Sequence, residues 1–214
     1  FAKKIKKGLP VLYYISPQIW AWGKRRIKTI RKHISKMLVI LPFEKVLYDR
    51  ERVHCECVGH PLLDSLRAEG DRNCLRNQLG LSAAEKAIAL LPGSRGPEVE
   101  RIFPLMIETA RHIRPLMPEA RFFLKRSANV PNPIYDGILS GFKDVRIEES
   151  ELHFHDLARA MDFGLITSGT ATLETALLGT PFFLFYKASW STYVLGKRLV
   201  RVPFLGLVNL LAGK

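Results

Sequence analysis

The feature that most constrains the fold is an alternation of short apolar runs with helical patterns along the 214-residue chain. The runs are VLYYIS (11–16), MLVIL (37–41), CECVG (55–59), AIALL (87–91), RFFLK (121–125), VRI (145–147), FGLIT (163–167) and FFLFY (182–186). Buried parallel strands typically read as continuous apolar runs, and their alternation with helices indicates βαβ units. The sequence therefore predicts an α/β fold built on parallel sheets.

The predicted strands form two groups, separated by a polar and helical stretch at 62–86. We expect one Rossmann-type part over 1–66, a helical connection over 67–86 and a second Rossmann-type part over 87–214. Three strands in about sixty residues are too few for a complete doubly wound domain, so the first part is expected to be incomplete. The start at Phe1 and the apolar end near Lys214 also suggest a piece of a longer protein.

A helical period is clear from Pro104 to Leu116. Its apolar face is formed by Leu105, Met106, Thr109, Ala110, Ile113 and Leu116. Proline disrupts a helix interior but is favoured in a first turn. We therefore predict a short turn over 98–103 and a helix that begins at Pro104.

The formal net charge of +13 is concentrated at one end, since residues 1–36 carry eleven Lys and Arg and no acid. Such a face suits nucleic acid, anionic lipid headgroups or phosphorylated substrates, or is simply solvated. Zinc-finger, RRM and arginine-rich signatures are absent, which disfavours nucleic acid. Aromatic residues interleave with the charge in YYISPQIWAWGKRR (13–26), which favours a membrane surface.

The cysteines, Cys55, Cys57 and Cys74, are few and odd in number, which is typical of a reducing compartment. The stretch HCECVGH (54–60) resembles a metal-binding cluster, but zinc sites usually space cysteines by two to four residues and need a second ligand pair. We interpret it as a strand and expect neither a metal nor a cofactor.

The first chemical motif is LLPGSRGPEVE (90–100), a strand that ends in a tight turn before a helix. Ligands of open α/β sheets bind beyond the carboxyl ends of strands, where helix N–H groups attract phosphate. Gly93 allows close approach, Ser94 donates a hydroxyl and Arg95 offers a planar fork to two phosphate oxygens. An ordinary βα turn with a surface arginine is the alternative.

The second motif is ITSGTATLETALLGTPF (166–182), in which a strand again ends in a turn before a helix. Ser168 or Thr170 is expected to cap this helix, around Gly169, and its N–H groups would face the same edge as Arg95. Glu174 lies one turn along, placed to accept hydrogen bonds from paired sugar hydroxyls or simply to stabilise the helix dipole. A nucleotide diphosphate would fit across both turns.

Two further polar positions are ambiguous. Asn209 lies inside the apolar run FLGLVNLLAGK (204–214) and either contacts a ligand or satisfies a neighbouring loop. His153 and His155 lack a nucleophile elbow nearby, so we expect surface histidines at a helix start rather than an acid–base pair.

Taken together, these stretches resemble the lipid-A-disaccharide synthase family, bacterial glycosyltransferases of the two-Rossmann GT-B architecture. The resemblance covers nearly the whole chain. It rests on YYISPQIWAWGKRRIKTIRK, LPFEKVLYDR, VGHPLLDSL, LLPGSRGPEVERIFPLMIETA, SGTATLETALLGTPFFLFYKAS and LVNLLAGK, in the family's order. It implies transfer of a diacylated glucosamine from UDP to diacylglucosamine 1-phosphate, with inversion at the anomeric carbon and without a tightly bound metal.

The resemblance also implies roles for individual residues. Ser94 and Arg95 would hold the diphosphate, with Arg95 as the catalytic group that stabilises the leaving UDP. The turn Ser168-Gly169-Thr170 and Glu174 would hold the UDP ribose and phosphates, and Asn209 would contact the donor. The segment from Tyr14 to Lys32 would face the inner membrane from the cytoplasm and help receive acylated sugars.

The chain departs from the family's pattern at both ends. The Gly-rich acceptor segment, the upstream acid usually proposed as general base and a closing C-terminal segment have no counterpart here. We therefore assign no general base within the chain. The alternatives are another GT-B enzyme, such as a MurG-like transferase or a UDP-sugar epimerase, and a non-catalytic basic module that holds RNA or membrane.

Overall fold

A computed structural model describes residues 9–20, 25–66, 70–187 and 206–212. By their contacts, the described residues up to Ser65 form one compact unit, and those from Leu66 on form a second. The roles predicted for the parts 1–66, 67–86 and 87–214 stay predictions. The basic residues Lys3, Lys4, Lys6, Lys7 and Lys24 lie outside the described residues.

The first unit is a three-stranded parallel sheet of order β1-β2-β3. Its elements are β1 (Leu12–Tyr14), α2 (Arg26–His33), β2 (Lys36–Val39), α3 (Pro42–Arg50), β3 (Cys55–Cys57) and α4 (Leu62–Ser65). Met37, Val39 and Cys55 point into a small core with Ile30 and Tyr48. The stretch HCECVGH thus contains the predicted strand, shorter at its end by two residues.

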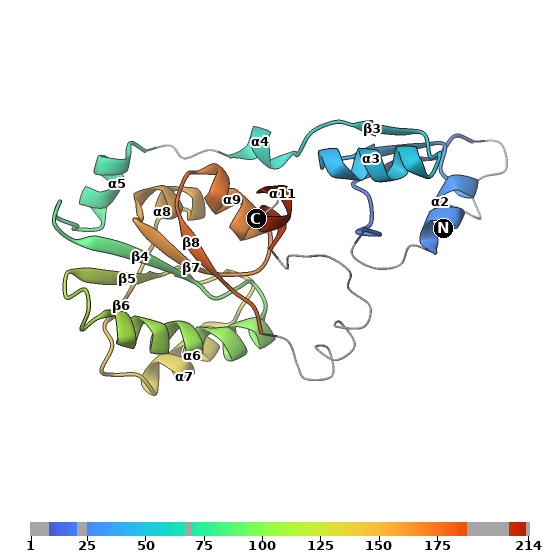
Figure 1. The fold of residues 1–214 in the computed structure, drawn as a ribbon. Coiled ribbons are helices and arrows are strands. Elements are labelled where there is room, and N and C mark those ends of the chain that lie inside the picture. The colour runs from blue at the N-terminus through green and yellow to red at the C-terminus, as the bar shows by residue number, and fades with distance from the viewer. Residues whose placement is uncertain (1–8, 21–24, 67–69, 188–205, 213–214) are drawn as a thin grey trace. The chain divides into compact units, whose positions relative to one another are not determined.

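The second unit is a five-stranded parallel sheet of order β6-β5-β4-β7-β8 (Figure 1). Its strands are β4 (Lys86–Leu91), β5 (Ala120–Leu124), β6 (Ile147–Glu149), β7 (Phe163–Thr167) and β8 (Phe182–Phe185). Its helices are α5 (Arg72–Gln78), α6 (Gly96–Ile113), α7 (Asn132–Ser140), α8 (Phe154–Ala160), α9 (Thr170–Leu177) and α11 (Leu207–Ala212). The predicted α/β class with parallel sheets is confirmed.

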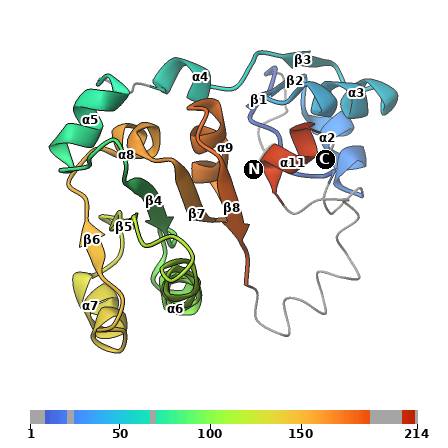
Figure 2. The same cartoon turned by 60° about the vertical axis from the view of Figure 1, so that its left-hand side comes forward.

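Helices cover both faces of this sheet, with α6 and α7 on one side and α5, α8 and α9 on the other (Figures 1 and 2). Because side chains alternate along a strand, β4 directs Ile88 and Leu90 into the core under α6, and Ala87 and Ala89 into the opposite core. The apolar run 87–91 is thereby buried on both faces, as is typical of a central parallel strand.

The predicted start of a helix at Pro104 is wrong, because α6 runs without a break from Gly96 to Ile113. Its buried stripe crosses the proline and is formed by Val99, Ile102, Phe103, Met106, Ile107 and Ala110. An interior proline costs roughly 3 kcal/mol, whereas burying each large apolar side chain gains about 1.5–3 kcal/mol. The free energy gained by burying the stripe therefore exceeds the cost of the proline. Leu105 and Leu116, which the pattern placed on the apolar face, are exposed.

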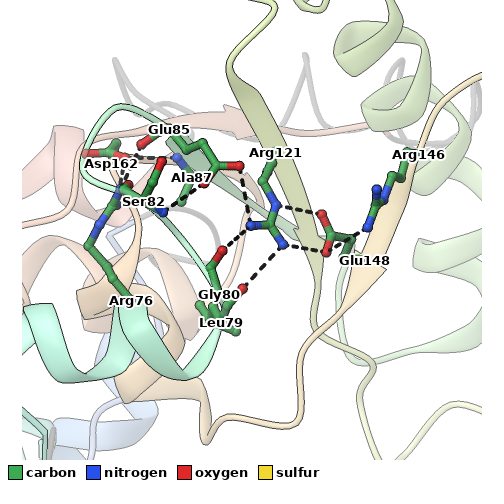
Figure 3. A network of polar contacts seen from close by, with 10 residues as sticks. All are labelled: Arg76, Leu79, Gly80, Ser82, Glu85, Ala87, Arg121, Arg146, Glu148 and Asp162. Carbon is green, nitrogen blue, oxygen red and sulfur yellow. Dashed lines mark hydrogen bonds and ion pairs between the residues drawn. The ribbon is translucent and has the colours of Figure 1, made fainter.

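A polar network fastens the amino-terminal edge of the sheet (Figure 3). Arg76 of α5 pairs with Asp162 at 2.9 Å and donates to the Glu85 carbonyl at 2.7 Å. Arg121 of β5 binds Glu148 of β6 through two nitrogens, at 2.8 and 2.7 Å. The described part of the predicted connection 67–86 thus contributes α5 to the second unit, packed against α8.

The described residues contain neither a helix that could span a membrane nor a metal-binding cluster. None of the helices there is long and apolar enough to cross a membrane. Within the same residues, no three His, Cys, Asp or Glu side chains cluster as ligands of one metal ion.

Candidate functional site

The strand order of the second unit creates a switch point between β4 and β7. From β4 the chain passes through α6 to β5 and β6 on one side, and then returns through α8 to β7 and β8 on the other. The loops that leave β4 and β7 therefore diverge at the carboxyl edge, where open α/β sheets bind ligands. Leu91 and Ile166, near these two strand ends, are paired in register.

A cavity of about 480 Å³ opens at this edge. It is lined by Leu91, Gly93, Ser94, Arg95, Glu98, Lys125, Arg126, Ser127, Phe154, Thr167, Ser168, Gly169, Thr170 and Ala171. The structure thus brings together both predicted turns, Gly93-Ser94-Arg95 and Ser168-Gly169-Thr170. The other two predicted residues, Glu174 and Asn209, do not line this cavity.

The turn after β4 is shaped by Gly93, whose φ is +117°. This is a left-handed conformation, and a Cβ there would stand 2.9 Å from a carboxylate oxygen of Glu98, so glycine is required. Arg95 precedes α6 as its N-cap, and its side chain is 79% exposed, 3.5 Å from Glu98. Exposed pairs of this kind are worth about 0–1 kcal/mol, so Arg95 is free to turn toward an anion.

The turn after β7 differs from the prediction in one detail. Gly169 is the N-cap of α9, and neither Ser168 nor Thr170 makes a side-chain cap. The hydroxyl of Thr172 donates instead to the Gly169 carbonyl at 2.6 Å. The expected cap is therefore wrong, because the chain turns one residue later than a Ser168 cap needs and one earlier than a Thr170 cap needs.

Thr167, the last residue of β7, adds an unusual group to the cavity wall. The residue is 6% exposed, and its hydroxyl oxygen has no hydrogen-bond partner among the described residues. Buried hydroxyls without partners are uncommon and costly.

A third wall, after β5, was missed by the sequence analysis. Arg126 is held by Asp136 at 2.7 Å and by Glu149, and lies 5.2 Å over the ring of Tyr135. The Lys125 ammonium donates to the Ser150 carbonyl at 3.3 Å. The sequence did contain a signal for this wall, since RFFLK ends at the same edge of the sheet and is followed by the polar residues Arg126 and Ser127. The signal was weak because this stretch has no glycine-rich turn like those after β4 and β7.

Glu174 is paired with a histidine and is not among the residues that line the cavity. Its Oε2 lies 2.8 Å from Nε2 of His155, and the two side chains are 17% and 10% exposed. The prediction of a surface histidine is therefore wrong for His155, because α9 brings a carboxylate against the first turn of α8. His153, one residue before that helix, is exposed as predicted.

Asn209 lies on α11, which packs against α9. It borders a different hollow, of about 640 Å³, together with Phe183 and Leu184 of β8. The structure does not place Asn209 with the two turns.

In the first unit, the residues of SPQIW (16–20) are held by a buried carboxylate. Glu44 of α3 is 2% exposed and accepts from the Ser16 hydroxyl at 2.6 Å and from the Trp20 indole at 3.1 Å. Directly before this segment, Ile15 has a φ of +62°, which is unusual for a β-branched residue. The next four residues, AWGK (21–24), lie outside the described part of the chain.

These observations define the fold class of the chain. Two α/β units on parallel sheets, one with a cavity at its switch point, give the GT-B-like fold. The S. aureus MnaA–UDP co-structure shares this fold, with a TM-score of 0.57 and 12% identity over 87% of this chain and 52% of that one.

The chain belongs to the lipid-A-disaccharide synthetase family, whose model matches residues 1–214. Lipid-A-disaccharide synthase 1 of Legionella pneumophila strain Lens is 43% identical over 100% of this chain and 55% of its own length. Lipid-A-disaccharide synthase of Syntrophus aciditrophicus strain SB is 41% identical over 98% and 55%. The chain thus spans about half the length of these relatives.

Proposed function

We propose that the cavity at the β4–β7 switch point is the nucleotide-sugar site of a lipid-A-disaccharide synthase. The diphosphate of a UDP-linked diacylglucosamine would lie across the turns Gly93-Ser94-Arg95 and Ser168-Gly169-Thr170. The observation that carries the proposal is that these turns, 75 positions apart between Gly93 and Ser168, line one cavity with Lys125 and Arg126. Family membership supplies the chemistry.

In the proposed reaction, a hydroxyl of diacylglucosamine 1-phosphate attacks the anomeric carbon of the donor. The bond to the UDP oxygen breaks with inversion, UDP leaves, and the proton of the hydroxyl passes to a base that we do not assign within this chain. Arg95 would stabilise the negative charge that develops on the leaving diphosphate, together with the N–H groups at the start of α6 and α9. Asn209 would reach the donor only if α11 approached the cavity.

We also propose that the segment from Tyr14 to Lys32 meets the cytoplasmic face of the inner membrane. Among its described residues, Tyr14, Lys28 and Arg31 are exposed, and α2 has no acid in its first turn. Exposed aromatic and cationic side chains suit contact with headgroups above acyl chains. This segment would receive acceptor and donor from the leaflet in which they reside.

Calorimetry with UDP tests the donor site. We expect weak binding by the chain, and a loss of at least about tenfold in Arg95→Ala, because a charge-assisted phosphate contact disappears. Arg101→Ala is the matched control, since Arg101 is exposed on the same helix and does not line the cavity.

Equal affinities of the wild type and Arg95→Ala would remove Arg95 from the site. Binding that an RNA competitor abolished would favour the basic-module alternative. A UDP-sugar epimerase or a MurG-like transferase would bind UDP similarly, so turnover of the acylated donor by the full-length protein separates these enzymes.

A further inference from the structure

The largely buried pair between α8 and α9 has no role in the proposed reaction. Nε2 of His155 lies 2.8 Å from Oε2 of Glu174, at a place where both side chains are largely removed from water. A carboxylate oxygen accepts hydrogen bonds and a protonated ring nitrogen donates them, so we assign the donor role in this contact to Nε2 of the imidazole. The contact therefore gives Oε2 of Glu174 a hydrogen-bond partner but does not give one to Oε1.

The second oxygen is available. Among the described residues, Oε1 of Glu174 has no hydrogen-bond partner, and it does not count among the fully buried atoms without one. A largely desolvated carboxylate oxygen that is neither satisfied nor sealed is placed to accept a hydrogen bond from a ligand.

The pair also lies next to the cavity. Thr170 lines the cavity and precedes Glu174 by four residues, so both lie on one face of α9. On the other helix, Phe154 lines the cavity and its ring packs 5.5 Å from that of His155. Glu174 is therefore one helical turn, and His155 one residue, from a residue that lines the cavity.

We propose that His155 is a positioning residue for Glu174: it holds Oε2 so that Oε1 turns toward the 2′- and 3′-hydroxyls of a ribonucleotide in the cavity. This inference rests on the proposed donor site. It adds that recognition of the ribose depends on a histidine that does not itself touch the ligand.

The experiment compares UDP, 2′-deoxy-UDP and inorganic pyrophosphate by calorimetry at one pH and ionic strength. The wild type is expected to bind UDP about tenfold more tightly than 2′-deoxy-UDP, because a hydrogen bond to a charged acceptor is lost with the hydroxyl. Glu174→Ala should abolish this preference and leave the affinity for pyrophosphate unchanged.

Three variants of His155 isolate the positioning role. His155→Leu should reduce the preference to less than about twofold and keep pyrophosphate binding, since no donor holds Oε2. His155→Gln should retain most of the preference, because its amide nitrogen is four bonds from Cα, as Nε2 of histidine is. His155→Asn should fail like leucine, since its amide is one bond shorter. His153→Leu is the control at an exposed neighbour.

The outcomes separate the two proposals. A folded His155→Leu protein that keeps the wild-type preference would overturn the positioning role and leave the donor site intact. A wild type that binds UDP without preferring it over 2′-deoxy-UDP would also overturn it. Absence of UDP binding by the wild type would instead overturn the donor site, and the inference with it.

Discussion

The two units use different means to hold a parallel sheet together. In the second unit, helices cover both faces, and β4, β5 and β7 are largely buried. In the first, all three residues of β1 are exposed, and the described core has eight buried side chains. The second unit thus depends mainly on apolar burial, whereas the first adds a buried carboxylate that joins α3 to the segment after β1. Loss of a polar contact should therefore lower the free energy of unfolding by different amounts in the two units.

The largest effect is expected for Glu44→Ala in the first unit. The change leaves the hydroxyl of Ser16, the indole N–H of Trp20 and the amide of Leu41 without their acceptor. Unsatisfied buried donors cost about 1–3 kcal/mol each, and partial access of water should limit the total loss of unfolding free energy to about 3 kcal/mol. Hydrogen exchange should show lost protection in β2 and α3 and unchanged protection in β4 and β7.

Two variants control this experiment. Glu44→Gln keeps an acceptor oxygen and should cost less, and Glu51→Ala removes an exposed carboxylate just after the same helix. Equal protection in Glu44→Ala and Glu51→Ala would show that the buried carboxylate does not stabilise the first unit.

Local patterns were sufficient to predict the strands and both turns of the cavity. The run 87–91 is apolar enough for a central strand, and Pro-Gly-Ser-Arg ends it unambiguously. The run VRI (145–147) placed β6 two residues early, since its position is set by pairing of Ile147 with Phe122 and not by its own hydrophobicity. Positions fixed by neighbours in space are harder to predict.

Two polar residues illustrate that difficulty. His155 looks like a polar residue at a helix start, and its partner is 19 positions away on another helix. Glu44 looks like an ordinary acid in a first turn, and Ser16 and Trp20 lie 28 and 24 positions before it. Propensity describes each residue alone, whereas the burial of a polar side chain depends on whether tertiary structure supplies a partner.

A smaller effect is expected from acid in the second unit. Arg121 holds the pKa of Glu148 below its ordinary value through hydrogen bonds that outweigh the cost of burial. A carboxylate with a lowered pKa in the folded state stabilises it above the ordinary value near 4.5, and this contribution is lost as the pH falls through the lowered pKa. Glu148→Gln should cost about 1–2 kcal/mol at pH 7, and this difference should shrink as the pH approaches 3.

Denaturant unfolding at a series of pH values measures this difference. Glu119→Gln, an exposed carboxylate outside the network, should leave the unfolding free energy nearly unchanged. If the loss of unfolding free energy in Glu148→Gln stayed constant from pH 7 to pH 3, the charge of Glu148 would not contribute to stability. Only the shape of its side chain would then contribute.

The smallest effect is expected for Lys28→Gln on the basic surface of the first unit. A cationic side chain near an anionic membrane contributes about 1 kcal/mol, so binding to vesicles with anionic lipid should weaken about fivefold at low salt. Neutral vesicles and Lys143→Gln, an exposed cation of the second unit, provide the controls. If Lys143→Gln weakened binding as much as Lys28→Gln does, the membrane contact would follow net charge alone. The two units would then not differ in this respect, and the assignment of the membrane side to the first unit would fail.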